Sequence, residues 1–235
     1  MPSALGSNLS DALITPTALP MRHLPCLASL VTEVDGVVAQ IALGLKAHSG
    51  WAALVALAEE PGELAVVERQ RVELIESADA HWSKQPYHAA EGLDPRDRRD
   101  VVKRGIDAAR RIAVRELRAA VAGIAREKRR VAACAVLAGD PMPDWTIDEI
   151  LAVHFRMHKA EGELFRDALA RAVGACNLKL VPIPEKRLDE QAVKALHASA
   201  SSLRARVGAL AKSVGPPWGK DQKDAALAAW IALRS

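Results

Sequence analysis

The stretch from residue 37 to residue 75, VVAQIALGLKAHSGWAALVALAEEPGELAVVERQRVELI, decides the fold. Two short apolar runs within it, 37–45 and 51–57, are typical of buried strands, and residues 46–50 between them are predicted to form a turn. A third run, 64–75, follows a Pro-Gly turn and alternates toward its end, as an outer strand does. The stretch therefore predicts three antiparallel strands joined by tight turns.

Helices alternating with two more strands are predicted downstream. Residues 76–93 read as an irregular loop, after which Asp94 and Pro95 have the residue types of a helix N-cap and first position. An apolar run without polar alternation, 131–137, predicts a central strand. The remaining predicted elements are a helix at 146–176 opened by a capping box, a strand at 178–183, a helix at 189–212 and a last helix from about residue 220.

Composition limits the classes of protein that this chain can belong to. Half of its 235 residues are hydrophobic but only 3% are aromatic, which predicts an aliphatic, Ala-rich core. The net charge of +3 permits nucleic-acid binding without requiring it. Cys26, Cys134 and Cys176 are far apart, which argues against a zinc knuckle or a disulfide framework and favours reduced thiols in the cytoplasm. No apolar run reaches about 18 residues, so no membrane span is predicted.

The chain is predicted to hold one domain preceded by an arm. Residues 1–35 contain scattered Pro, Gly and Ser that break any hydrophobic period, so we expect an N-terminal arm without regular structure. Residues 36–235 are predicted to form a single domain, since they show no internal repeat and no low-complexity linker. A homodimer is compatible with this organisation.

Two carboxylates stand in the first turn of the last predicted helix, where GPPWGKDQKDAAL, residues 215–227, changes from a Gly/Pro loop to an Ala-rich helix. Asp221 and Asp224 are three residues apart and so share one helix face, at the end whose partial positive charge favours anions. Two such acids could hold one divalent cation through oxygen. The alternative is that they serve only as ordinary helix-capping residues.

A second candidate metal site lies on the predicted helix 146–176. His154, His158 and Glu161 are spaced at i, i+4 and i+7, which places them on one face, and imidazoles four residues apart can share a transition-metal ion. A half-buried polar face that meets the edge of the sheet would produce the same pattern. The choice between these two interpretations stays open from the sequence.

The strand order and three local motifs resemble the ribonuclease H-like superfamily, in particular the branch of RuvC-type Holliday-junction resolvases. The hairpin sequence IALGLKAHSGWA, residues 41–52, is similar to that family's first strand and its entry into the second. Ile183-Pro184-Glu185-Lys186 is similar to the end of its fifth strand, and DQKDAALA, residues 221–228, resembles its closing helix. The resemblance implies an α/β fold with a five-stranded mixed sheet, three strands antiparallel and two parallel, flanked by helices.

The resemblance also implies an acidic site, from which this chain departs at two positions. The family's acid in strand one falls near Leu43, and residues 37–49 contain no acid. The end of the fourth strand likewise has none, with Asp140 just beyond it. A site for two metals needs carboxylates around both ions. We therefore expect Mg²⁺ or Mn²⁺ to bind at Asp221 and Asp224 as one ion at most.

These observations lead to one main functional hypothesis and two rivals. The main hypothesis is a ribonuclease H-like domain that binds DNA, RNA or another phosphate-bearing ligand, with weak or absent metal-dependent nuclease activity. Its catalytic candidates are Asp221, Asp224 and His48, and its phosphate- or nucleic-acid-binding candidates are Lys46, His48, Trp82, His88 and Lys186. The rivals are a non-catalytic structural or assembly module, and a helix-borne metal enzyme that uses His154, His158 and Glu161.

Overall fold

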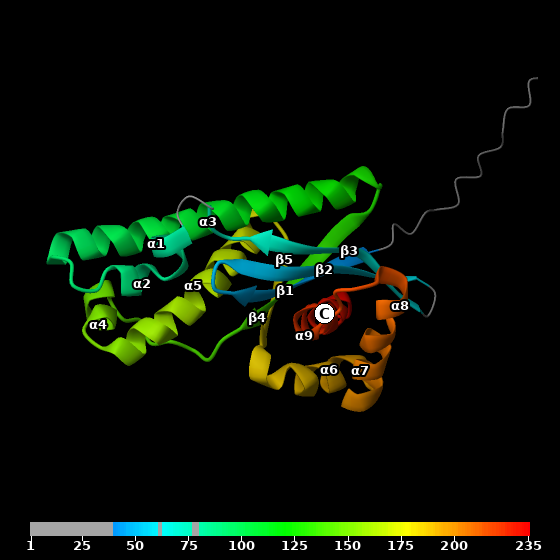
Figure 1. Cartoon of the computed structure of the whole chain (residues 1–235). Helices are drawn as coiled ribbons and strands as arrows, with labels where there is room; N and C mark the ends of the chain where they lie inside the picture. The colour runs from blue at the N-terminus through cyan, green and yellow to red at the C-terminus, as the bar shows by residue number, and fades with distance from the viewer. Residues whose placement is uncertain (1–39, 61–62, 77–79) are drawn as a thin grey trace, which may run out of the picture. The chain divides into compact units, whose positions relative to one another are not determined.

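The computed structural model describes residues 40–60, 63–76 and 80–235 (Figure 1). The predicted arm of residues 1–35 lies outside the described residues, as do the first three residues of the predicted first strand. Within the described part of the chain, no helix combines the length and the apolar character that a membrane span requires.

The described chain contains a five-stranded mixed sheet with the order β3-β2-β1-β4-β5. Strand β1 pairs with β2, and β2 with β3, in antiparallel fashion, whereas β4 runs parallel to β1 and β5 runs parallel to β4. This order confirms the predicted ribonuclease H-like sheet. The strands are β1 Gln40–His48, β2 Trp51–Glu60, β3 Glu63–Glu73, β4 Arg130–Ala138 and β5 Lys179–Pro184.

Helices cover both faces of the sheet (Figure 1). The long helices α3 and α5 pack on one face in a first hydrophobic core, and α9 packs on the other with α6 and α7 in a second core. The helices are α1 Ala80–Lys84, α2 Pro86–Ala89, α3 Pro95–Arg126, α4 Ile147–Leu151, α5 His154–Ala175, α6 Leu188–Leu196, α7 Ala200–Ala209, α8 Ala211–Val214 and α9 Lys220–Leu233, with a 3₁₀ turn at Glu185–Arg187.

Two predicted helices are interrupted, and one predicted loop contains helices. The helix predicted at 146–176 breaks between α4 and α5, where Val153 has an extended conformation. The helix predicted at 189–212 ends first at His197, which adopts a left-handed φ of 53°, and Ser199 then caps α7 by accepting from the backbone N–H of Ser202. The loop predicted at 76–93 contains the short helices α1 and α2 in its described part.

The prediction of a turn at residues 46–50 was wrong. Strand β1 continues through His48, and only Ser49 and Gly50 make the turn, with Gly50 at a φ of 86°. Lys46 pairs with Ala53 of β2, inside the ladder. Lys46 therefore belongs to the sheet, and its side-chain direction is set by the strand's two-residue alternation.

Helix α9 approaches β1 more closely than a side chain on the strand would allow. A Cβ atom at Gly44 would lie 1.8 Å from the carbonyl oxygen of Ala225 and 2.8 Å from the backbone nitrogen of Ala229. Both neighbours are backbone atoms, so neither can move aside as a flexible side chain could. Small residues on both elements therefore bring the first turns of α9 beside the end of β1.

Replacing Gly44 by Ala is expected to destabilise the protein by about 3 kcal/mol, because the added methyl group forces α9 away from β1. Replacing Gly123 by Ala is the matched control, since a Cβ there meets nothing within 4 Å and Ala favours the helix by roughly 0.5–1 kcal/mol. Urea unfolding of the two variants measures both effects. Equal stability of the two variants would contradict the close packing described here.

Candidate functional site

Lys46 is held on the α9 face of the sheet. Ala42 belongs to the core beneath α9 and Gly44 touches α9, so Lys46, two residues further along the strand, points the same way. Lys46 is only 4% exposed to solvent. Leu43, near which the resemblance placed an acid, is fully buried in the opposite core against α3 and α5. Leu43 therefore points away from α9, whereas Lys46 and His48 of β1 face the acids.

Three carboxylates surround the ammonium group of Lys46. Its Nζ lies 2.7 Å from Oδ2 of Asp224, 3.1 Å from Oε1 of Glu185 and 3.3 Å from Oδ1 of Asp221. Two of these acids come from the first turns of α9, and Glu185 comes from the 3₁₀ turn that follows β5. The structure thus brings Asp221 and Asp224 beside Lys46, as the sequence hypothesis required.

A second set of cations surrounds the same acids from outside. Arg204 Nη1 lies 2.6 Å from Oδ1 of Asp224, and Lys220 Nζ lies 2.7 Å from its Oδ2. Arg166 Nη2 lies 3.2 Å from Oε2 of Glu185. Arg204 also pairs with Asp189 at 2.7 Å, so with Lys46 the cluster contains four permanent cations for four acids and carries no net negative charge.

His48 extends the cluster along β1. Its Nε2 lies 3.2 Å from Oδ2 of Asp221, and its ring stacks on Trp51 with a centroid distance of 4.3 Å. Arg71 covers the same indole at 3.9 Å from the ring centroid. The His48 ring is therefore oriented by stacking on Trp51, whereas its Nε2 makes no hydrogen bond to the described residues, and about a third of the side chain is exposed.

The ion pairs change the acidity of the buried groups. Burial alone would raise the pKa of Asp224, but the hydrogen bonds from Lys220, Lys46 and Arg204 outweigh it and lower that pKa to about 2. For Lys46, burial opposes the charged form, yet the bonds to Asp224 and Glu185 raise its pKa above the ordinary value. The ion pairs with Lys46 and Arg166 overcome burial at Glu185 and lower its pKa. All three groups are thus charged at neutral pH.

The residues of this cluster do not fit a divalent metal ion in the arrangement observed. A hard cation would bind between the carboxylate oxygens, and the ammonium group of Lys46 lies among those oxygens at hydrogen-bond distance. A metal ion at that point would have to displace the ammonium group. It would also meet the positive charges of Lys220, which contacts the same Oδ2 of Asp224 as Lys46, and of Arg204, which contacts Oδ1.

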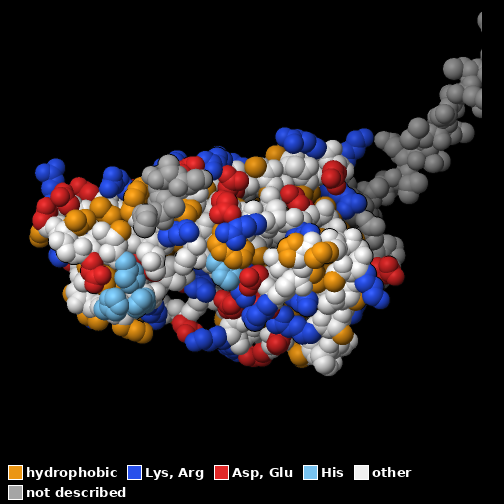
Figure 2. Space-filling view, viewed as in Figure 1, with side chains coloured by type: hydrophobic (Ala, Val, Ile, Leu, Met, Phe, Trp, Pro, Cys, Tyr) orange, Lys and Arg blue, Asp and Glu red, His pale blue; other side chains and the backbone are white. Residues whose placement is uncertain are grey.

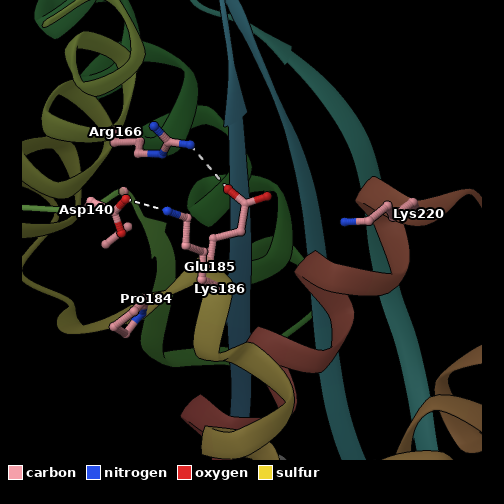
Figure 3. A pocket seen from close by; sticks show the side chains of 8 residues that line it. Asp140, Arg166, Pro184, Glu185, Lys186 and Lys220 are labelled. Carbon is pink, nitrogen blue, oxygen red and sulfur yellow. Dashed lines mark hydrogen bonds and ion pairs between the residues drawn. The ribbon is translucent and has the colours of Figure 1, made fainter. Parts of the chain in front are cut away.

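A cavity of about 500 Å³ opens beside the cluster (Figure 3). Arg166 reaches across it to Glu185, Lys186 pairs with Asp140, and Lys220 extends toward it from α9. Arg166 Nε is buried and has no hydrogen-bond partner among the described residues. The lining residues are Ala138, Gly139, Asp140, Arg166, Pro184, Glu185, Lys186 and Lys220.

Trp82 and His88, the aromatic candidates for nucleic-acid contact, line neither this cavity nor the Lys46 cluster. The Trp82 ring lies 5.2 Å from the guanidinium carbon of Arg104 on α3. His88, on α2, faces Glu161 of α5. Lys186 does line the cavity, so the structure gathers Lys46, His48, Lys186, Asp221 and Asp224 and separates the two aromatic candidates from them.

His88, His154 and His158 form a second group (Figure 2, where histidines gather beside α2 and α4). Nε2 of His154 and Nε2 of His158 are 3.0 Å apart, and the His88 ring centroid lies 4.7 Å from that of His158. Glu161, the third residue of the predicted site, accepts hydrogen bonds from the backbone N–H groups of Tyr87 and His88. Burial raises the pKa of Glu161 to about 7.

Sequence reasoning missed Arg166 and Arg204 as members of the charged cluster. Arg204 lies in α7, where no motif marks it, and it reaches Asp224 only because α7 packs beside α9. Arg166 lies within the predicted helix 146–176, where its spacing from Glu161 and Glu163 resembles an ordinary solvated face. Glu185 appeared only as part of a motif similar to the resolvase family.

No protein-family model matches this chain, and no curated protein is similar to it. The strand order defines a ribonuclease H-like fold. Among solved structures, the chain is similar to Thermus thermophilus RuvC at 12% identity, with 81% of this chain and 92% of that chain covered and a TM-score of 0.42. The same protein in complex with a Holliday junction substrate matches at 10% identity, with coverages of 83% and 93% and a TM-score of 0.45.

A yeast mitochondrial Holliday junction resolvase is also similar in fold, at 14% identity, with 86% of this chain and 83% of that chain covered and a TM-score of 0.39.

Replacing Asp224 by Asn is expected to remove a pH-dependent part of the stability. In the folded protein the pKa of Asp224 is about 2, below its ordinary value of 3.8. The ionised carboxylate therefore stabilises the fold fully at pH values above 3.8, and this stabilisation is lost as the pH falls from about 4 to about 2. The contribution is about 2 kcal/mol. Urea unfolding at several pH values should show a shallower pH dependence for the variant than for the wild type.

Asp221→Asn is the matched control for Asp224→Asn, because the Asp221 side chain is 29% exposed and makes longer contacts with Lys46 and His48. Its stability loss at neutral pH should be the smaller of the two, since a surface ion pair contributes little. If the two variants lose equal stability, or if Asp224→Asn keeps the wild-type pH dependence, Asp224 is not the central acid.

Proposed function

We propose that this protein binds nucleic acid, or another phosphate-bearing ligand, at the cavity beside Lys46, with metal-dependent cleavage that is slow or absent. The observation that carries the proposal is the position of the Lys46 ammonium group. It lies within 3.3 Å of three carboxylates on a ribonuclease H-like sheet. A fixed ammonium group is present where such a cluster of acids would otherwise attract a divalent ion.

Phosphate binding is supported by the cations at the rim of the cavity. The side chains of Lys186 and Lys220 are 79% and 78% exposed. The pair of Lys186 with Asp140 is exposed on both sides, so a phosphate can compete for that ammonium group at little cost, whereas Lys220 also bonds to the buried Asp224. Arg166 adds a guanidinium group to the wall of the cavity, a group that can bind a phosphate with two N–H donors.

Slow or absent cleavage follows from the chemistry that Lys46 supplies. A lysine ammonium group can stabilise negative charge on a phosphate, but it does not lower the pKa of a bound water as a metal ion does. His48, stacked on Trp51 and close to Asp221, is the candidate general base of this cluster. Such a site retains one general base and lacks the metal-bound nucleophile.

One observation favours the rival reading of a structural or assembly module. Asp221, Asp224 and Glu185 each already have cationic partners from the chain itself. A cluster whose charges are satisfied internally can serve to join β1, β5, α7 and α9 without any ligand. The two readings differ in whether the exposed lysines contribute to affinity for nucleic acid.

The double variant Lys186→Ala/Lys220→Ala is expected to bind nucleic acid more weakly than the wild type. Each lost phosphate contact should lower the slope of log K against log salt by about 0.9, so the slope should fall by about 2. Fluorescence anisotropy with a four-way DNA junction, single-stranded DNA and single-stranded RNA measures this. Lys212→Ala, an exposed lysine in α8, is the matched control. Identical curves for the wild type and the double variant would support the structural module instead.

Replacing Lys46 by Asp is expected to create affinity for Mn²⁺ that the wild type lacks. The change removes the resident ammonium group and adds an oxygen ligand beside Asp221, Asp224 and Glu185. Calorimetric titration with Mn²⁺ and thermal melting with and without Mn²⁺ measure the effect, and added Mn²⁺ should raise the melting temperature of the variant alone.

Lys46→Met provides a second test if Lys46→Asp folds poorly, because it removes the charge while keeping a similar side-chain volume. Its Mn²⁺ affinity should also exceed that of the wild type. Equal Mn²⁺ affinity in the wild type and both variants would show that Lys46 does not exclude the ion, and the argument for slow cleavage would fail.

A further inference from the structure

We infer that His88, His154 and His158 form a binding site for one divalent transition-metal ion, best suited to Zn²⁺, with one coordination position left for water. This site lies apart from the Lys46 cluster, and the inference does not depend on the proposed nucleic-acid function. Neutral imidazoles are ligands that Zn²⁺ prefers, and three of them with an open fourth position form a known zinc arrangement.

The three imidazoles already converge. One ligand nitrogen from each lies within 4.8 Å of the other two, although the residues come from two helices, α2 and α5. Nε2 of His154 and Nε2 of His158 are 3.0 Å apart. Two nitrogens bound to one tetrahedral zinc at about 2.0–2.1 Å are about 3.3 Å from each other, so this pair is close to the spacing required.

Carboxylates stand behind two of the imidazoles, on the side away from this contact. Nδ1 of His88 lies 3.4 Å from Oε1 of Glu161, and Nδ1 of His154 lies 3.7 Å from Oε1 of Glu91. A metal-bound histidine usually donates its other ring N–H to a carboxylate, which fixes the tautomer and orients the ring. A proton on each Nδ1 leaves Nε2 free to bind the ion.

Glu161 explains why the site can be rigid although His154 and His158 are exposed. Glu161 is only 5% exposed. Its Oε1 accepts hydrogen bonds from the backbone N–H of Tyr87 at 2.8 Å and from that of His88 at 3.2 Å. These bonds attach α2 to α5 and hold His88 opposite the other two histidines. Glu161 is thus a positioning residue, and His88 takes the ligand role that the sequence hypothesis gave to Glu161.

The surface next to the histidines leads toward the Lys46 cluster. His158 lines a second cavity of about 350 Å³ together with Gly139, Asp140 and Arg166, and these three residues also line the cavity beside Lys46. Phe155, 71% exposed, forms part of the same wall. A ligand in the first cavity would therefore extend along α5 toward His158.

The test uses the full chain freed of metal by a chelator and then titrated with Zn²⁺ alone. Calorimetry should give one ion per chain, and Co²⁺ in place of Zn²⁺ should give the visible absorption of a tetrahedral nitrogen site. His88→Ala and His158→Ala should each weaken Zn²⁺ binding by about 100-fold or more. Glu161→Gln should weaken it about 10–100-fold. His197→Asn, a histidine outside the cluster, should bind as the wild type does.

Several results would overturn the site. These are no saturable Zn²⁺ binding, binding that survives His88→Ala, or an intense sulfur-to-cobalt absorption band showing that cysteines hold the ion. Thermal melting of each metal-free variant keeps the test decisive, because a variant that has merely lost its fold melts without cooperativity. A variant that keeps the wild-type transition and loses only the Zn²⁺-induced rise in melting temperature supports the site. His158→Ala is best placed for this, since His158 is exposed.

Discussion

The close contact between α9 and β1 at Gly44 places the acids of α9 beside Lys46. The absence of a side chain at this position lets the backbone at Ala225 approach the strand. Asp224 directly precedes Ala225 on α9, Asp221 lies one turn earlier, and Lys46 lies two residues beyond Gly44 on β1. A displacement of about 1 Å between the two elements would separate the ammonium group from its nearest carboxylate, because hydrogen bonds weaken steeply beyond about 3.2 Å. A change that disrupts the apolar packing of α9 on β1 would therefore also break the polar cluster.

A buried ammonium group among three acids is expensive to desolvate, so its contacts must be nearly complete. Lys46 makes one short bond to Asp224 and two longer contacts to Glu185 and Asp221. Asp224 in turn has three cationic partners. Such a network contributes more to a unique arrangement of β1, α7 and α9 than to net stability, since the Coulomb gain is largely offset by desolvation. It selects one register of α9 against the strand.

Much of the fold could be predicted from sequence because it depends on local patterns. Apolar runs marked the strands, Asp94 marked the start of α3, and Thr146 with Glu149 marked that of α4. The break at His197 had a signal in Ser199, a good helix N-cap, whereas the break at Val153 had none. The site was harder to predict, because it depends on contacts between distant segments. Lys46 lies in a sequence typical of a turn, and only its pairing with Ala53 shows that it continues the strand.

Lys46 also gives the carboxylate cluster a counter-ion that is covalently part of the chain. A dissolved ion occupies a site according to its concentration in the surroundings, whereas a tethered group is present at a high effective concentration wherever the protein is folded. The positive charge at this point is therefore made with the polypeptide and cannot exchange with the medium. The charge at the carboxylate cluster is therefore the same at low and at high concentrations of magnesium.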